Sequence, residues 1–316
     1  MPGVLAAWQW NLGLVAWNRA ALSGSDVSDE VVLRRAVRRW EQALTWGPAR
    51  SDFLLYLGSA YEQVGDERGA LRTWQQLDRP FQALMTEGRS YLTGGFASAS
   101  LPWFRGASKV APDVGDPWYY IAQALVQVGR PEGALEALDK ALQAPRLEEL
   151  HRSQLYFEKG VIYQWRLQPS RLQEAAEAYR AALTWGGFPT ADLEADAHYK
   201  LGETLWWKGD DPALYIVEFQ RAIVLNPDHS HAHVLLGVAY YLKTGDVEKA
   251  EREIMLGMKI NPQNVWGPMN LGAQVYEPAG MIEEAVEAYR WALNIQPDFE
   301  PAARALQRLQ TGRSSP

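Results

Sequence analysis

Three histidines, a residue type that ligates metals, form the only histidine cluster in this sequence. His229 and His233 are four residues apart, so they would share one face of a helix, with His231 between them. Metal ligation would require further ligands and a supporting second shell of hydrogen bonds. Because Asn226-Pro227-Asp228 precedes a predicted helix, we expect these histidines at its exposed N-terminus instead, where His231 could touch a partner.

Two acidic segments resemble metal loops superficially. Gly209-Asp210-Asp211 and Gly245-Asp246 fall in predicted inter-helix turns, where aspartate caps the next helix. Glu148-Glu149 and Glu283-Glu284 are expected at helix starts, where the helix dipole favours carboxylates. The sequence contains no cysteine, no Gly-rich phosphate loop and no Gly-x-Ser-x-Gly or His-Glu-x-x-His motif. We therefore predict no enzymatic activity, no cofactor and no metal site.

The composition is that of a folded, mildly acidic protein. The 316 residues are 47% hydrophobic and 22% charged, which is too apolar for a disordered chain. The net charge of −7 disfavours nucleic acid and anionic lipid as whole-molecule partners, although a local basic patch could override it. Residues 1–22 are apolar, but Gln9, Asn11, Asn18 and Arg19 interrupt them. They fit a first packed helix better than a signal peptide or a membrane span.

A repeated Leu-Gly pair is the main structural signal in the sequence. Glycine inside a helix costs up to about 1 kcal/mol. Its recurrence therefore predicts a point where a second helix must approach closely. The clearest copies are Leu57-Gly58, Leu201-Gly202, Leu236-Gly237 and Leu271-Gly272.

A second pattern follows each of these copies. Alanine, a large apolar residue and alanine are spaced by four and then three, which marks one face of a helix. Glycine turns such as Val64-Gly65-Asp66 separate the two patterns, and a proline often closes the unit. Tryptophans at packing positions of the second helix are predicted core residues: Trp40, Trp74, Trp103 and Trp291. Clear copies of the pattern are Ala36-Trp40-Ala43, Ala134-Leu138-Ala141, Ala175-Tyr179-Ala182 and Ala285-Tyr289-Ala292.

This organisation resembles the tetratricopeptide repeat family. Residues 115–146 carry the family's spacing with Trp118, Ile121, Ala122, Leu125, Gly129, Ala134, Leu138 and Ala141. The resemblance implies an all-α, right-handed superhelical solenoid of about eight helix pairs with a C-terminal capping helix. We predict one solenoid over 1–310, with a capping helix over 301–310 and a flexible tail over 311–316. Extra residues near 23–30 and 168–171 are expected to bulge as loops. The predicted repeats lie near 6–50, 51–80, 81–114, 115–150, 153–189, 195–229, 230–264 and 265–298.

In the resembled family, the first helix of each pair lines the inside of the superhelix. The resemblance therefore implies a groove, and most of its positions here hold aromatic or aliphatic residues. Such a face usually marks a binding site, although several of these side chains could pack between helices instead. Arg89 is its one clear cation, and Asp52, Asp116 and Asp196 lie near helix starts. The candidate groove-binding residues are Leu55, Met85, Arg89, Tyr119, Gln123, Phe157, Tyr199, Glu203, Trp206, Val234, Tyr241, Trp266 and Met269.

The charges of this groove favour some partners over others. Family members that grip acidic C-terminal tails use lysines, arginines and asparagines on adjacent first helices, and this sequence lacks that set. Nucleic acid would require a basic groove. We expect a non-catalytic scaffold or adaptor, of bacterial type, that binds an apolar or basic peptide segment of a partner protein.

Two alternatives stay open. One is an accessory module of a bacterial cell-envelope polysaccharide or glycan assembly system, whose aromatic groove would bind a neutral saccharide. The other is a self-associating scaffold, that is, a homo-oligomer. The expected location is the cytoplasm, or a membrane-associated soluble domain without a transmembrane segment.

Overall fold

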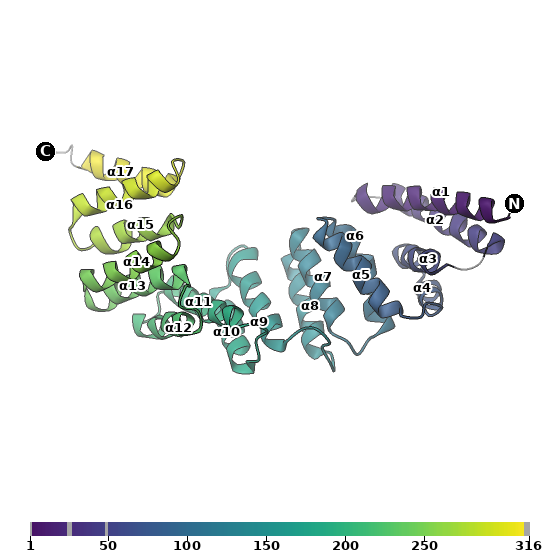
Figure 1. Ribbon diagram of the computed structural model, residues 1–316, viewed down its shortest axis with the longest axis horizontal. Helices are drawn as coiled ribbons and strands as arrows, with labels where there is room; N and C mark the ends of the chain where they lie inside the picture. The colour runs from purple at the N-terminus through teal and green to yellow at the C-terminus, as the bar shows by residue number, and fades with distance from the viewer. Residues whose placement is uncertain (1, 24–26, 48–49, 313–316) are drawn as a thin grey trace. The chain divides into compact units, whose positions relative to one another are not determined.

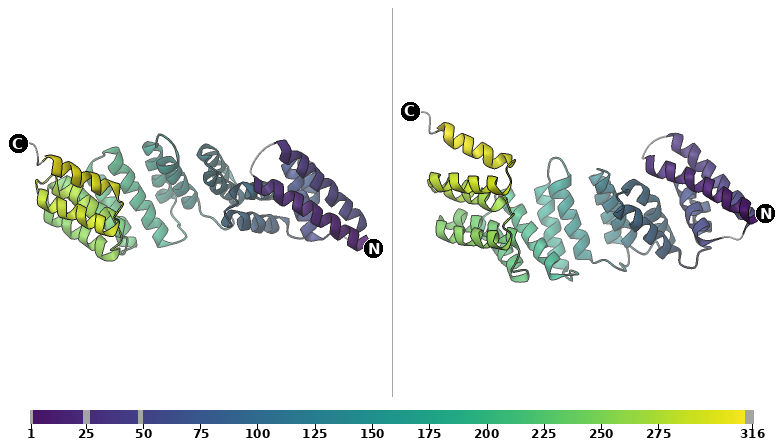
Figure 2. Two further views of the ribbon diagram at one scale, coloured as in Figure 1. Left: turned by 90° about the horizontal axis from the view of Figure 1, so that it is seen from above. Right: turned by 45° about the horizontal axis from the view of Figure 1, so that its top comes forward.

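The computed structural model describes residues 2–23, 27–47 and 50–312. Within these ranges the chain consists of helices and contains no β-strand. They form two compact units, Met1–Leu150 and His151–Pro316, and in each unit consecutive helices pack as pairs (Figures 1 and 2). The predicted all-α architecture of stacked helix pairs is confirmed. That all pairs belong to one solenoid over 1–310 stays a prediction, and residues 313–316 of the predicted tail lie outside the described residues.

Unit 1 contains four helix pairs among its described residues. Their members are α1 (Pro2–Ser23), α2 (Val27–Trp46), α3 (Ser51–Gln63), α4 (Glu67–Trp74), α5 (Pro80–Thr93), α6 (Ala97–Val110), α7 (Asp116–Gln127) and α8 (Pro131–Gln143).

The described residues of unit 2 form four further pairs and a last single helix. In two pairs the first helix continues as a short π-helix. The elements are α9 (Arg152–Val161) with η1 (Ile162–Arg166), α10 (Leu172–Trp185), α11 (Ala191–Lys208), α12 (Pro212–Leu225), α13 (Ser230–Thr244), α14 (Val247–Ile260), α15 (Trp266–Asn270) with η2 (Leu271–Tyr276), α16 (Ile282–Ile295) and α17 (Glu300–Gly312).

The helix-interior glycines mark close approach of the paired helix, as predicted. A Cβ atom on Gly202 of α11 would lie 2.7 Å from the ring of Phe219 on α12. Phe219 is buried, so the ring fills the space that a side chain at position 202 would need. The same relation recurs in other pairs, at Gly58, Gly88, Gly160 and Gly272. The repeated glycine and the repeated aromatic residue are therefore two sides of one contact.

The predicted turns and caps are also present. Gly209 follows α11 in the left-handed conformation, with φ of 75°, which glycine adopts without the steric cost of a side chain. The side chains of Asp211 and Asp246 accept hydrogen bonds from the backbone N–H groups of Ala213 and Lys249. These aspartates are helix caps.

The predicted core tryptophans lie where the second-helix pattern puts them. Trp40, Trp74 and Trp103 are fully buried. Trp291 is partly buried and packs against the core of the last helix pairs.

Two expectations about the connections between helices were wrong. Glu148 and Glu149 are not at a helix start, since α9 begins at Arg152; their backbone N–H groups donate to the buried carboxylate of Asp116 at 2.8 and 2.7 Å. That carboxylate holds the loop that follows α8. The extra residues near 23–30 also do not form a simple bulge, because helix α2 already begins at Val27. Residues 24–26 lie outside the described residues, and 168–171 do form a loop.

No helix in the described part of the chain combines the length and the apolar character that crossing a membrane requires.

Candidate functional site

The predicted groove residues of unit 1 are largely committed to internal contacts. Leu55, Met85 and Tyr119 are buried. Gln123 is partly exposed, and its amide donates to the hydroxyl of Tyr119 at 2.8 Å. The guanidinium of Arg89 lies 2.6 Å from the carboxylate of Glu149 and 5.7 Å from the centre of the Tyr120 ring. The cation predicted to face a ligand is thus already paired.

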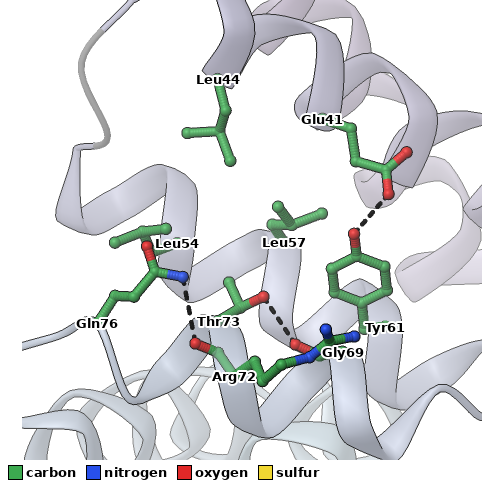
Figure 3. Close-up of a pocket in the computed structure, with 9 residues that line it drawn as sticks. All are labelled: Glu41, Leu44, Leu54, Leu57, Tyr61, Gly69, Arg72, Thr73 and Gln76. Atoms are coloured by element: carbon green, nitrogen blue, oxygen red, sulfur yellow. Dashed lines mark hydrogen bonds between the residues drawn. The ribbon is translucent and has the colours of Figure 1, made fainter.

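A cavity of about 390 Å³ is also present in unit 1 (Figure 3). Leu44 of α2, Leu54 and Leu57 of α3 and Thr73 of α4 line it, and the hydroxyl of Tyr61 donates to the carboxylate of Glu41 at its edge at 2.5 Å. None of the predicted groove residues contributes to its lining.

The predicted groove residues of unit 2 present a more accessible surface. Phe157, Trp206, Tyr241 and Met269 come from successive first helices and are partly exposed. Trp206 packs against both hydrophobic cores of the unit, with Phe157 at one core and Tyr241 and Met269 at the other. We call these four residues the aromatic face of unit 2.

The other predicted positions of unit 2 lie beneath or beside the aromatic face. Tyr199, Glu203 and Val234 are buried. Trp266 is exposed at the start of α15, with its ring edge-on to Phe299 at 5.1 Å. The structure therefore divides the predicted set into surface residues and residues that support them.

A buried carboxylate organises the support of the aromatic face. One oxygen of Glu203 accepts from the hydroxyl of Tyr199 at 2.9 Å. The other accepts from the amide of Gln164 at 3.1 Å and from the ammonium group of Lys200 at 2.9 Å. The hydroxyl of Tyr179 donates to the amide oxygen of Gln164 at 2.8 Å. Burial and then the charge of Glu203 raise the pKa of Tyr199, so its hydroxyl stays protonated and remains a donor.

The π-helix η1 brings one residue into this network and turns the next outwards. Gln164 is almost fully buried, whereas Trp165 is 45% exposed and packs edge-on against Trp207 at 4.6 Å. Isolated π-helical turns are frequent at functional sites. The break in helical register thus accompanies both a buried glutamine of the network and an exposed tryptophan pair.

Sequence reasoning missed Lys200. Its ammonium group contacts Glu203 and lies 5.2 Å from the centre of the Trp165 ring and 4.9 Å from that of Tyr199. It was missed because it is one residue beyond a predicted groove position. The sequence does contain a signal for it: Lys200 and Glu203 have opposite charges and are three residues apart, and residues at this spacing are neighbours on a helix surface.

The three histidines do not converge on one point. His229 caps α13 through a hydrogen bond from the N–H of Ala232, as expected for a helix start, and its other ring nitrogen lies 3.1 Å from Asp196. Its side chain is only 9% exposed, so its expected exposure was wrong. His231 is exposed. His233 is buried, so its expected exposure was wrong: it lies one turn inside the helix, on the side that packs on α14. In the described residues, no three His, Asp or Glu side chains are placed to hold a metal ion.

The buried ring of His233 gives unit 2 a predicted pH dependence. Its Nδ1 lies 2.9 Å from the carboxylate of Glu253, and its Nε2 lies 3.1 Å from the carbonyl oxygen of Pro227. The hydrogen bond with Glu253 is the main cause that raises the pKa of His233 above its ordinary value of 6.5. Its stabilising contribution is therefore complete below about pH 6.5 and is lost as the pH rises through the raised pKa.

His233→Gln should therefore cost more unfolding free energy at about pH 6 than at about pH 9. Urea unfolding of both proteins at the two pH values measures this difference. A cost that is the same at both would show that the charged form of His233 does not contribute.

Comparisons with known proteins agree with this architecture. Two family models described as tetratricopeptide repeat match residues 85–147 and 218–265, and residues 269–299. No curated protein matches the chain in sequence.

Similar solved structures share the fold. PilW, a type IV pilus biogenesis factor, has a TM-score of 0.57 at 17% identity, over 73% of this chain and 100% of PilW. Pseudomonas aeruginosa pilF has a TM-score of 0.56 at 17% identity, over 73% of this chain and 97% of pilF. A chain of the APC/C hetero-tetramer Cut9-Hcn1 has a TM-score of 0.55 at 18% identity, over 91% of this chain and 57% of that one. The matched repeat models identify residues 85–147, 218–265 and 269–299 as tetratricopeptide repeats, and the helix pairs with their glycine–aromatic contacts continue the same architecture through the other described residues.

Proposed function

We propose that the aromatic face of unit 2 binds an extended, mainly apolar segment of a partner protein, so that the chain acts as a non-catalytic interaction scaffold. The observation that carries this proposal is the row Phe157, Trp206, Tyr241 and Met269. These large apolar side chains come from four successive first helices and remain partly exposed. Aromatic side chains and methionine are enriched in the cores of protein interfaces.

The polar groups around this face supply its orientation and charge preference. Glu203, itself bound by Gln164 and Lys200, holds the hydroxyl of Tyr199 in the core against which Trp206 packs. This network pre-organises the surface and lowers the entropic cost of binding. The carboxylate of Asp196 is about half exposed beside His229. A basic residue flanking the apolar segment would be attracted by Asp196, whereas Lys200 is already balanced by Glu203.

A library of random peptides displayed on phage, selected against the full chain, tests the proposal. Trp206→Ala should weaken binding of a selected apolar peptide by at least about tenfold, since anchor residues commonly contribute about 2 kcal/mol or more. Trp185→Ala is the matched control, because Trp185 is an exposed tryptophan on a second helix of the same unit. Equal losses in the two variants, measured by titration calorimetry, would contradict a site on the aromatic face.

A neutral saccharide is a second candidate ligand, favoured by the exposed pair Trp165 and Trp207. Flat aromatic rings beside polar groups suit sugar rings, and such a ligand would fit a role in cell-envelope glycan assembly. A glycan array distinguishes the two candidates: binding that Trp207→Ala abolishes and Trp206→Ala spares would favour the saccharide. Self-association is the third candidate, and a monomer at all concentrations in light scattering would exclude it.

A further inference from the structure

The outer side of α1 is mainly apolar and nearly uncharged, with the exposed Asn11 among its apolar side chains. Leu5, Trp8 and Val15 are 47%, 56% and 68% exposed, and their spacing places them on one side of the helix. Among its 22 residues, α1 has one charged residue, Arg19, and no acid. Single exposed apolar side chains are ordinary, but several on one side of an uncharged helix form a patch of the kind that meets a partner.

Arginines of the paired helix border this patch. Helix α2 carries four arginines between residues 34 and 39. The guanidinium of Arg39 lies 3.4 Å from the amide oxygen of Gln9 on α1, so this stretch of α2 runs beside α1. Arg35 and Arg38 are exposed, and neither forms an ion pair with a described residue. Helices α1 and α2 pack side by side (Figures 1 and 2), so the first helix pair carries both the exposed apolar side chains and the exposed arginines.

We propose that this surface of the first helix pair binds the surface of an anionic lipid bilayer. Apolar side chains with a tryptophan among them enter the boundary between headgroups and acyl chains, where the indole is favoured. The arginines match lipid phosphates in charge and in the geometry of their donors. Although the chain as a whole is acidic, α1 and α2 together contain five arginines and three acids, so the first helix pair carries a small net positive charge.

The same charges argue against a second copy of the chain as the occupant. A symmetric contact between two copies places the same patch on both sides. It would bring Arg35 and Arg38 of the two copies together, whereas α1 has no acid and Glu30 and Glu41 of α2 are already bound to Arg34 and Tyr61. A bilayer with anionic headgroups complements both the exposed apolar side chains and the exposed arginines. The helix would lie along the membrane surface, since α1 does not qualify as a membrane span.

Co-sedimentation of the full chain with vesicles tests this proposal, using phosphatidylcholine alone and phosphatidylcholine mixed with phosphatidylglycerol. We expect binding to the mixed vesicles and much weaker binding to the neutral ones. Trp8→Ser should lower the affinity by at least about tenfold, as should the double variant Arg35→Glu/Arg38→Glu. Trp185→Ser is the matched control, because Trp185 is 57% exposed but lies on α10; it should bind as the wild type does.

Three results would overturn the proposal. They are no binding of the wild type to the mixed vesicles, equal loss in Trp8→Ser and Trp185→Ser, and a dimer in light scattering that Trp8→Ser dissociates while vesicles are not bound. Circular dichroism of each variant separates a loss of binding from a loss of fold. Because this surface shares no residue with the aromatic face of unit 2, either proposal can fail while the other stands.

Discussion

Phe219→Ala should destabilise the chain by about 3–5 kcal/mol, the cost of removing a fully buried aromatic ring from a packed core. The ring lies between α11 and α12 and contacts Gly202. Gly202→Ala should cost about 1–3 kcal/mol by overpacking, because the added Cβ would meet the ring at 2.7 Å. In the double variant the clash disappears. The double variant should therefore lose less unfolding free energy than the two single variants lose together. Urea unfolding followed by circular dichroism measures all three.

Val224→Ala is the control for this set. Val224 lies on the same helix and is 73% exposed, so its replacement should change the unfolding free energy by no more than about 0.5 kcal/mol. Additive costs for Gly202→Ala and Phe219→Ala would contradict the view that the repeated glycine exists to admit the repeated aromatic ring.

Glu203→Ala should destabilise unit 2 by about 3 kcal/mol, because the hydrogen-bond donors that the carboxylate now binds would be left without an acceptor. The hydroxyl of Tyr199 and the amide of Gln164 are buried and would lose their acceptor. Lys200 is partly exposed and can turn towards water, which places the cost at the low end for a broken buried ion pair. Thermal or urea unfolding measures it.

Glu218→Ala provides the comparison. Glu218 is also a carboxylate on a neighbouring helix with one close partner, His198 at 2.7 Å, but it is more exposed. Its loss should cost less than about 1 kcal/mol. If Glu203→Ala cost no more than Glu218→Ala, the buried network would not be what holds the aromatic face in place.

The fold could be predicted from the sequence because the same contact between a glycine and a large side chain recurs in successive repeats. Gly202 with Phe219 and Gly272 with Tyr289 are local pairs about one helix apart, so the periodicity reveals both partners. Turn residues such as Gly209 with Asp211 carry their own backbone preference. A pattern that recurs at a fixed spacing predicts the fold without any knowledge of contacts between residues that are far apart in the sequence.

The candidate site was less accessible to this reasoning. Groove positions assume regular α-helix, and the π-helix at Ile162–Arg166 shifts the residues that follow, so Trp165 was not identified. The partners of His233 and Asp116 lie on other elements, at Glu253 and in the loop after α8. Burial of a polar side chain depends on such partners, which one helix pattern does not encode.

Site-specific photocrosslinking with a peptide selected from the phage library tests the central claim most directly. A photoreactive amino acid at Tyr241, on the aromatic face, should crosslink to the bound peptide. The same amino acid at Val224, exposed on the second helix α12, should not. Crosslinking from position 224, with none from 241, would show that the peptide binds the chain outside its aromatic face.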